Sequence, residues 1–104
     1  MTKAKIEWDE RKRKENLEKH GFDFVDAAGV FNKDTVTILD DRDDYGERRF
    51  LTIGQCARVV VVISHTEDDN VIRVISMRKA GRNEEDAYFR EVGHELEADR
   101  GDEG

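Results

Sequence analysis

One segment of the sequence combines a strand pattern with a cluster of cations. Residues 71–77 are mostly apolar, as in a buried β-strand, but Arg73 interrupts the run, and Arg78, Lys79 and Arg82 follow it. A guanidinium within a buried strand costs free energy unless an acid pairs with it or it opens into a cleft. Because guanidinium groups bind phosphate oxygens through paired hydrogen bonds, the cluster predicts a phosphate-binding surface. The structural alternatives are an ion pair to a flanking helix for Arg73 and a solvated strand end for Arg78 and Lys79.

His65 is the side chain best suited to proton transfer near neutral pH, because its reference pKa is about 6.5. It directly precedes the polar stretch 66–70, which separates two strand-like runs. If the connecting turn has an odd number of residues, Arg73 aligns with His65. An even turn aligns Arg73 with Ser64 and Thr66 instead, so only the odd register puts His65 and Arg73 on one face. A structural role at a strand end is the alternative for His65.

Arg73 and Arg78 are five positions apart in the chain. Side chains alternate along a strand, so strict alternation sends the two to opposite faces. Their convergence on one site therefore requires the strand to end or to bulge near Met77.

Other chemistries lack their usual residue patterns. The metal-binding residue types His20, His65, His94 and Cys56 are dispersed, without the paired spacing of metal sites. Neither of the two serines lies in a nucleophile elbow, and a glycine-rich phosphate loop is missing. The acidic turn at residues 40–44 is more typical of a solvated loop than of a cation site. We therefore assign no metal and no cofactor.

The net charge of −7 is unevenly distributed along the 104 residues. Residues 84–104 contain nine acidic and two basic side chains and so account for the whole imbalance. Outside the acidic stretches 40–47 and 67–69, the remaining body is basic, which is compatible with a nucleic-acid partner. The sequence contains no run of about 18 apolar residues, so it predicts no membrane-spanning helix. The charged N-terminal residues do not resemble a secretory signal. We expect a cytoplasmic protein with no membrane partner.

The sequence pattern predicts an α+β fold, whose strands and helices would position the candidate site residues. Strand patterns occupy residues 4–8, 35–39, 49–53, 59–64 and 71–77. The run 59–63 has no polar face, which is typical of a central strand covered on both sides. Short polar connections favour hairpins, so we expect a mostly antiparallel sheet.

Three helices are expected around this sheet, two before it in sequence and one after it. The first covers residues 10–20, capped by Asp9 and ended by Gly21, and a short one follows from Asp23. Asn83 is the predicted cap of the last helix, and its apolar stripe comprises Tyr88, Phe89, Val92 and Leu96. The length predicts a single domain over residues 1–98, followed by an acidic, frayed tail over residues 99–104.

Several short motifs, taken in order, resemble the BrnT family of bacterial toxins. They are Trp8-Asp9, Asn16, Lys19-His20-Gly21, Phe24 with Ala27 and Phe31, the segment 47–54, His65-Thr66-Glu67, the segments 72–76 and 78–80, and Tyr88. No single motif is specific, but the ordered set covers most of residues 6–90. Many relatives look more basic at the start of the last helix, where this chain has Glu84 and Glu85.

This resemblance implies a RelE-like ribonuclease fold and the toxin half of a type II toxin–antitoxin pair. The implied partners are an RNA substrate and a BrnA-like ribbon-helix-helix antitoxin in a hetero-oligomer. DNA would be contacted only through the antitoxin.

The hypothesis that follows is metal-independent cleavage of RNA, in which the ribose 2′-OH attacks the neighbouring phosphate. Arginine stays protonated, so its role is to stabilise charge on the phosphorane, whereas His65 is the candidate for proton transfer. The catalytic candidates are thus Arg73, Arg78 and His65, and the substrate-binding candidates are Lys79, Arg82 and Arg49. The alternative is a non-catalytic module of the same fold whose basic face docks a protein or nucleic-acid partner.

Overall fold

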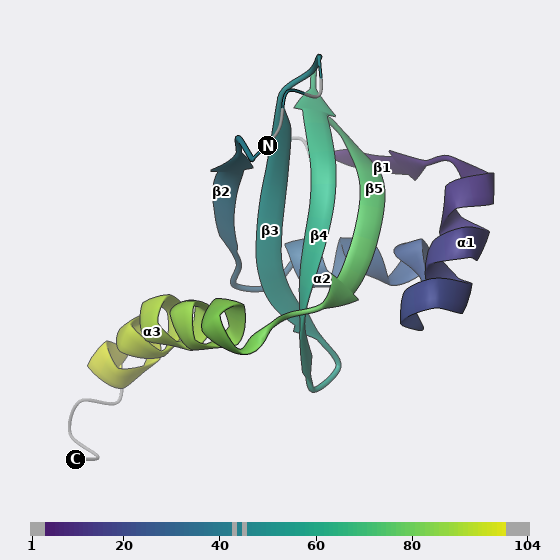
Figure 1. Cartoon of the computed structure of the whole chain (residues 1–104). Helices are drawn as coiled ribbons and strands as arrows, with labels where there is room; N and C mark the ends of the chain where they lie inside the picture. The colour runs from purple at the N-terminus through teal and green to yellow at the C-terminus, as the bar shows by residue number, and fades with distance from the viewer. Residues whose placement is uncertain (1–3, 43, 45, 100–104) are drawn as a thin grey trace.

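A computed structural model describes residues 4–42, 44 and 46–99, with side chains of the last helix described as far as Gly93. Five strands form one sheet in the order β1-β5-β4-β3-β2 (Figure 1). Their bounds are β1 Lys5–Trp8, β2 Val36–Asp40, β3 Arg49–Cys56, β4 Val59–Asp68 and β5 Val71–Lys79. β1 runs parallel to β5, and the other three pairs are antiparallel. The α+β class and the mostly antiparallel sheet are confirmed.

The central strand is β4, as its unbroken apolar run predicts. Residues 60–63 are at most 2% exposed, and they alternate between two apolar clusters on opposite faces of the sheet. We call one face the α2 face, with Val61, Ile63, Val74 and Met77. The other is the α3 face, with Leu51, Ile53, Val60 and Val62.

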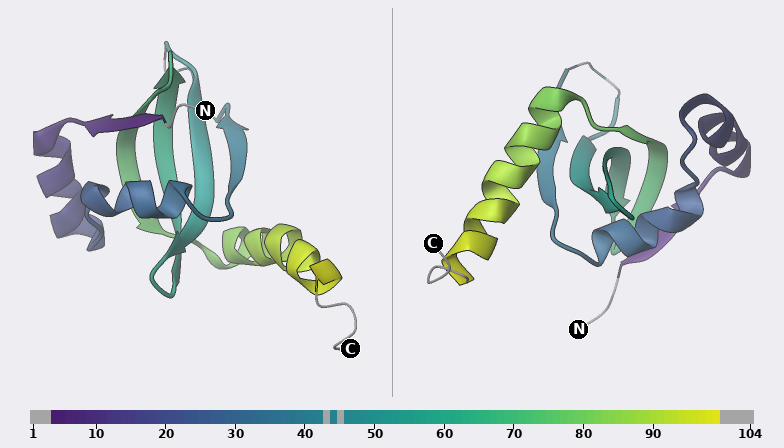
Figure 2. Two further views of the ribbon diagram at one scale, coloured as in Figure 1. Left: turned by 180° about the vertical axis from the view of Figure 1, so that it is seen from behind. Right: turned by 90° about the horizontal axis from the view of Figure 1, so that it is seen from below.

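The N-terminal helices lie on and beside the α2 face. α1 (Glu10–His20) contacts β5, while the 3₁₀ turn η1 (Phe24–Asp26) and α2 (Ala27–Phe31) lie across the sheet (Figure 2). Phe24, Ala27 and Val30 supply the buried side chains of this layer. The predicted caps of α1 are confirmed, because Asp9 accepts hydrogen bonds from two backbone amides and Gly21 is left-handed at φ 81°.

The third helix, α3 (Arg82–Asp99), packs on the α3 face at one end of the sheet. Tyr88 and Val92 are buried there, and the Tyr88 hydroxyl donates to the Asp34 carbonyl at 3.0 Å. The view from below shows α2 and α3 on different sides of the sheet (Figure 2). One detail of the predicted helix differs, because Phe89 is 47% exposed. The Leu96 side chain lies outside the described residues.

The start of α3 also corrects the sequence prediction. The helix begins at Arg82, so Asn83 lies inside its first turn rather than at the cap. Glu84 takes over the capping role, because its carboxylate accepts the Gly81 amide at 2.7 Å. A glutamate that reaches back to the cap residue in this way satisfies an amide that the helix itself leaves unpaired.

The β4–β5 hairpin is longer than the sequence pattern indicated. Its turn has only two residues, Asp69 and Asn70, both with positive φ (48° and 66°). Such a turn matches the twist of the flanking strands, so pairing extends almost to the tip.

None of the helices in the described part of the chain is long and apolar enough to cross a membrane. Residues 100–104 of the predicted tail lie outside the described residues.

Candidate functional site

A β-bulge in β5 decides which side chains share a face. Ser64 of β4 pairs with Ser76, but the next residue, His65, pairs with Val74. Ile75 is therefore an extra residue on β5, with no partner of its own on β4. A bulge of this kind reverses the alternation of side chains beyond it and re-aims them relative to the rest of the strand.

The bulge brings Arg73 and Arg78 to the same face of the sheet. Arg73 lies opposite Thr66 and Arg78 lies opposite Val62, and both of these β4 residues belong to the α3 face. The sequence analysis required an end or a bulge of the strand near Met77 for the two arginines to converge. The observed bulge is at Ile75, two residues earlier. Arg49 also belongs to this face, because it lies two positions before Leu51.

Arg78 is held by an acid of the last helix. Its guanidinium donates two hydrogen bonds of 2.8 Å to the Glu84 carboxylate, and both side chains are about one-third exposed. The pair raises the pKa of Arg78 and lowers the pKa of Glu84 to about 2. Because Glu84 also caps α3, this one carboxylate links the end of β5 to the start of the helix.

The Arg73 side chain is exposed and does not lie in the middle of a buried strand, contrary to what the sequence pattern indicated. The reason is its position towards the hairpin end of the sheet. It forms no hydrogen bond or ion pair with another described side chain, so the helix ion pair considered from sequence is not present there. Arg73 lines a pocket of about 530 Å³. Two cations, Arg48 and Arg73, share this pocket with five acids, namely Glu7, Glu47, Glu67, Asp68 and Asp69. The surroundings of Arg73 are therefore net negative.

The remaining cationic candidates are not gathered at one place. Lys79 lies opposite Val61 and so belongs to the α2 face, where it is exposed. Arg82 is an exposed residue in the first turn of α3. Arg49 contacts the Glu47 carboxylate at 3.3 Å. The structure thus brings Arg49, Arg73 and Arg78 to the α3 face but leaves Lys79 on the other side.

His65 lies on the α2 face and has no exposed surface. The two-residue turn selects the even register, in which Arg73 pairs with Thr66 rather than with His65. Phe31 and Phe50 pack against the imidazole with ring centroids 5.1 and 5.9 Å away. In the described conformation a ring in this position cannot touch a strand of RNA on the α3 face.

The polar atoms of His65 have one strong partner. Nε2 lies 2.6 Å from the Thr52 hydroxyl, whose oxygen is also 2.8 Å from the Thr37 hydroxyl. Nδ1 has no hydrogen-bond partner and lies 3.6 Å from the Glu67 carboxylate. Desolvation dominates, so burial lowers the pKa of His65 to about 4 and keeps the ring neutral near pH 7.

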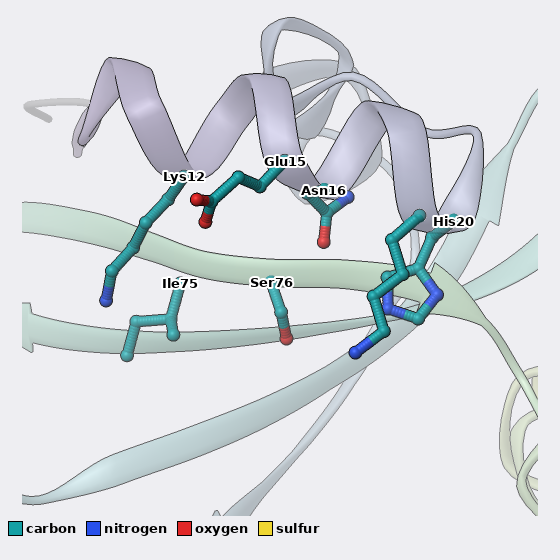
Figure 3. Close-up of a pocket in the computed structure, with 7 residues that line it drawn as sticks. Lys12, Glu15, Asn16, His20, Ile75 and Ser76 are labelled. Atoms are coloured by element: carbon teal, nitrogen blue, oxygen red, sulfur yellow. The ribbon is translucent and has the colours of Figure 1, made fainter.

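A groove that the sequence prediction missed lies between α1 and β5 (Figure 3). Its volume is about 240 Å³, and its lining residues are Lys12, Glu15, Asn16, Lys19, His20, Ile75 and Ser76. The signal was available, because positions 12, 16 and 19 follow the i, i+4, i+7 spacing of one helix face. It was missed because that face carries polar residues rather than an apolar stripe.

Asn16 forms the floor of this groove and is only 7% exposed. Its amide oxygen accepts the Met77 N–H at 3.0 Å, and its amide nitrogen donates to the Met77 carbonyl at 2.8 Å and to the Phe22 carbonyl at 3.0 Å. The side chain therefore occupies the edge of β5 as a neighbouring strand would. This tie fixes α1 against β5 immediately before Arg78.

Comparison with known proteins gives a consistent result. None of the curated proteins matches the chain. The model of a family described as the ribonuclease toxin BrnT of type II toxin–antitoxin systems matches residues 8–84. Among solved structures, that of the Brucella abortus ribonuclease toxin BrnT is similar, with 30% sequence identity and a TM-score of 0.62. The match covers 76% of this chain and 99% of that chain. The chain therefore belongs to the BrnT family of ribonuclease toxins of type II toxin–antitoxin systems.

Proposed function

We propose that this chain is a RelE-like endoribonuclease that acts in the cytoplasm as the toxin of its pair and inhibits translation and growth. It cleaves RNA without a metal ion, by attack of a ribose 2′-OH on the adjacent phosphate. The single observation that carries this proposal is the common face of Arg73 and Arg78 produced by the bulge at Ile75. Two guanidinium groups on one sheet face can stabilise the extra negative charge of a phosphorane.

The roles divide by chemistry. Arg73 is exposed and has no described side-chain partner, so it is available to a phosphate. Glu84 holds two N–H groups of Arg78, so a phosphate must either use the remaining N–H groups of this guanidinium or displace that carboxylate. The flanking phosphates are held by Arg49, Lys79 and Arg82. The RNA strand reaches Lys79 by passing around the end of β5.

Proton transfer was assigned to His65 from sequence, and we keep that role as part of the proposal. It requires the aromatic contacts of Phe31 and Phe50 to open and the ring to reach the α3 face, since the ring is fully buried on the α2 face in the described conformation. A kinetic pKa well below 6.5 would be the signature, because burial lowers the pKa of this ring to about 4.

The partner in this proposal is a BrnA-like ribbon-helix-helix antitoxin that forms a hetero-oligomer with the toxin. Contact with DNA would come through the antitoxin alone. The support is the type II toxin–antitoxin family to which the chain belongs.

The test is expression of the wild type beside Arg73→Ala and Arg78→Ala in bacteria, following growth and the integrity of total RNA. Arg58→Ala is the matched control, because Arg58 is an exposed arginine in the β3–β4 turn and is not one of the proposed site residues. We expect growth arrest and RNA fragments with the wild type and the control. Each site variant should lose on the order of 10²-fold in cleavage rate, as expected when one charge-stabilising donor is removed.

Two further measurements test the chemistry. Purified protein should cleave RNA equally with and without a chelator, and it should leave DNA of the same sequence intact because DNA lacks the 2′-OH. Loss of cleavage in the chelator would exclude the metal-independent route. Equal cleavage of DNA would exclude attack by the 2′-OH.

A second candidate function is a non-catalytic binding module of the same fold. The Arg78–Glu84 pair and the five acids around Arg73 favour it, because both weaken the attraction of this face for phosphate. In that case expression of every variant leaves growth and RNA unchanged, while Arg73→Ala weakens the complex with the partner.

A further inference from the structure

The groove between α1 and β5 has a favourable charge for a polyanion. Of the cations on α1, Arg13 pairs with Glu10 and Asp23, and Arg11 lies 3.6 Å from Glu15. Lys12 and Lys19 line the groove and form no ion pair with a described side chain. The single acid of the groove, Glu15, is the one that Arg11 approaches.

The groove beside α1 and the pocket around Arg73 therefore differ in the sign of their charge. The pocket around Arg73 contains five acids and two cations, whereas the groove beside α1 contains two lysines and one acid. A phosphate backbone is attracted more strongly by the groove than by the pocket around Arg73. An RNA strand held at Arg73 and Arg78 would thus extend from Arg78 towards α1 rather than from Arg73 towards the hairpin tip.

The edge of β5 at the groove is closed to an added peptide strand. Both backbone polar groups of Met77 are already paired with the Asn16 amide. Addition of a strand needs free backbone donors and acceptors at a sheet edge. Recognition in the groove must therefore use side chains, which favours a polyanion over an extended peptide of the antitoxin.

The bulge connects the groove to the proposed catalytic face. Ile75 is the extra residue, and Ser76 follows it on β5, two positions before Arg78. Figure 3 shows the Lys12 side chain extending from α1 to the level of Ile75, with Ser76 alongside. Lys12 and Lys19 are seven residues apart on one helix, which corresponds to roughly 10 Å along its axis. Two cations at this separation can contact two different phosphates of one strand.

We propose that the α1–β5 groove binds the sugar–phosphate backbone of the RNA strand next to the scissile position. Lys12 and Lys19 neutralise two phosphates, and the Ser76 hydroxyl donates a hydrogen bond to one of them. This inference rests on the proposed function in one respect, namely that RNA is the substrate. It does not depend on whether, or how, the chain cleaves that RNA.

The experiment measures the affinity of the protein for a single-stranded 2′-O-methyl RNA oligonucleotide at several salt concentrations. Such a probe cannot be cut through its 2′ position, so binding is read separately from cleavage. The test variant is Lys12→Gln with Lys19→Gln. The control is Lys14→Gln with Lys33→Gln, which makes the same change in charge at exposed residues outside the groove.

We expect the plot of log affinity against log salt to be less steep by about 1.4 in the test variant, since each phosphate contact on a single strand contributes about 0.7 to the magnitude of the slope. The loss should be similar for probes of different sequence. The control should keep the wild-type slope, and Lys12→Arg with Lys19→Arg should keep it too. The fold of α1 should survive, because the removed charges lie at opposite ends of the helix dipole and their effects oppose each other.

An unchanged slope in the test variant would overturn the inference, as would a wild type that does not bind the probe. Loss of antitoxin binding with an unchanged RNA slope would also overturn it and would make the groove a protein interface. A protein that binds the probe through Lys12 and Lys19 but cleaves no RNA would leave this inference standing while the proposed nuclease activity fails.

Discussion

Asn16 and Met77, which are 61 positions apart, are joined by a reciprocal pair of hydrogen bonds. The Met77 N–H donates to the Asn16 side chain at 3.0 Å, and the Asn16 side chain donates to the Met77 carbonyl at 2.8 Å. Met77 is fully buried, so neither of its backbone groups could turn to water if this partner were lost. The contact therefore couples α1 to the strand that carries both proposed catalytic arginines.

Replacing Asn16 by alanine should lower the free energy of unfolding by about 2–6 kcal/mol. The cause is the loss of pairing at two buried backbone groups, each of which costs about 1–3 kcal/mol when left unsatisfied. The measurement is urea denaturation, with the midpoint and the slope both recorded. Asn83→Ala is the control, because Asn83 is exposed and caps no helix, so we expect a change below about 0.5 kcal/mol there. Equal stability of the two variants would contradict the structural role of Asn16.

Glu84→Gln should strengthen RNA binding by releasing Arg78. The glutamine can still accept the Gly81 amide and cap α3, but it no longer offers the guanidinium a charged partner. One more phosphate contact should steepen the salt dependence of single-strand binding by about 0.7. Glu85→Gln makes the same change in net charge one residue away and separates the local effect from the global one. If both variants changed RNA affinity equally, net charge rather than the Arg78 pair would be the cause.

Stability should fall as the pH drops from about 6.5 to about 4, with a contribution from His65. Burial lowers the pKa of this ring to about 4 in the folded protein, whereas the unfolded chain takes up the proton near pH 6.5. In that window the unfolded state binds more protons, so the free energy of unfolding decreases by about 1.4 kcal/mol per pH unit for this one group. His65→Gln removes the titrating group, and its stability should depend on pH correspondingly less over the same range. Denaturation midpoints at pH 7, 6 and 5 test this, and parallel curves for the two proteins would argue against it.

Gly54→Ala should destabilise the protein by about 1–3 kcal/mol through overpacking. A Cβ at position 54 would lie 2.7 Å from Val30 Cγ1 and 3.0 Å from Thr35 Cγ2, so α2 would have to move off the sheet. Gly29→Ala in α2 meets nothing within 4 Å and should be neutral or slightly stabilising, because alanine favours a helix more than glycine does. Thermal or urea unfolding of both variants gives the comparison. A Gly54→Ala protein as stable as the Gly29→Ala protein would show that α2 can shift without cost.

Local signals in the sequence determined most of the secondary structure and the family. The period of apolar residues located all five strands, and the Asp9 and Gly21 signals bounded α1 correctly, because capping depends on residues within one turn of the helix end. The ordered motifs that resemble BrnT toxins also lie along the chain and need no tertiary contact to be recognised. The family assignment from sequence is confirmed.

Only the tertiary structure decided how the candidate residues meet. The register of β4 against β5 depends on a two-residue turn and on a bulge at Ile75, and alternation along the sequence alone indicates neither. His65 and Arg73 therefore lie on opposite faces, whereas Arg73 and Arg78 share one. The burial of His65 comes from Phe31 and Phe50, which are distant in sequence, and the partner of Arg78 comes from a helix start that the sequence placed two residues too late. Such contacts depend on packing between elements, so they follow from the folded chain and not from any local pattern.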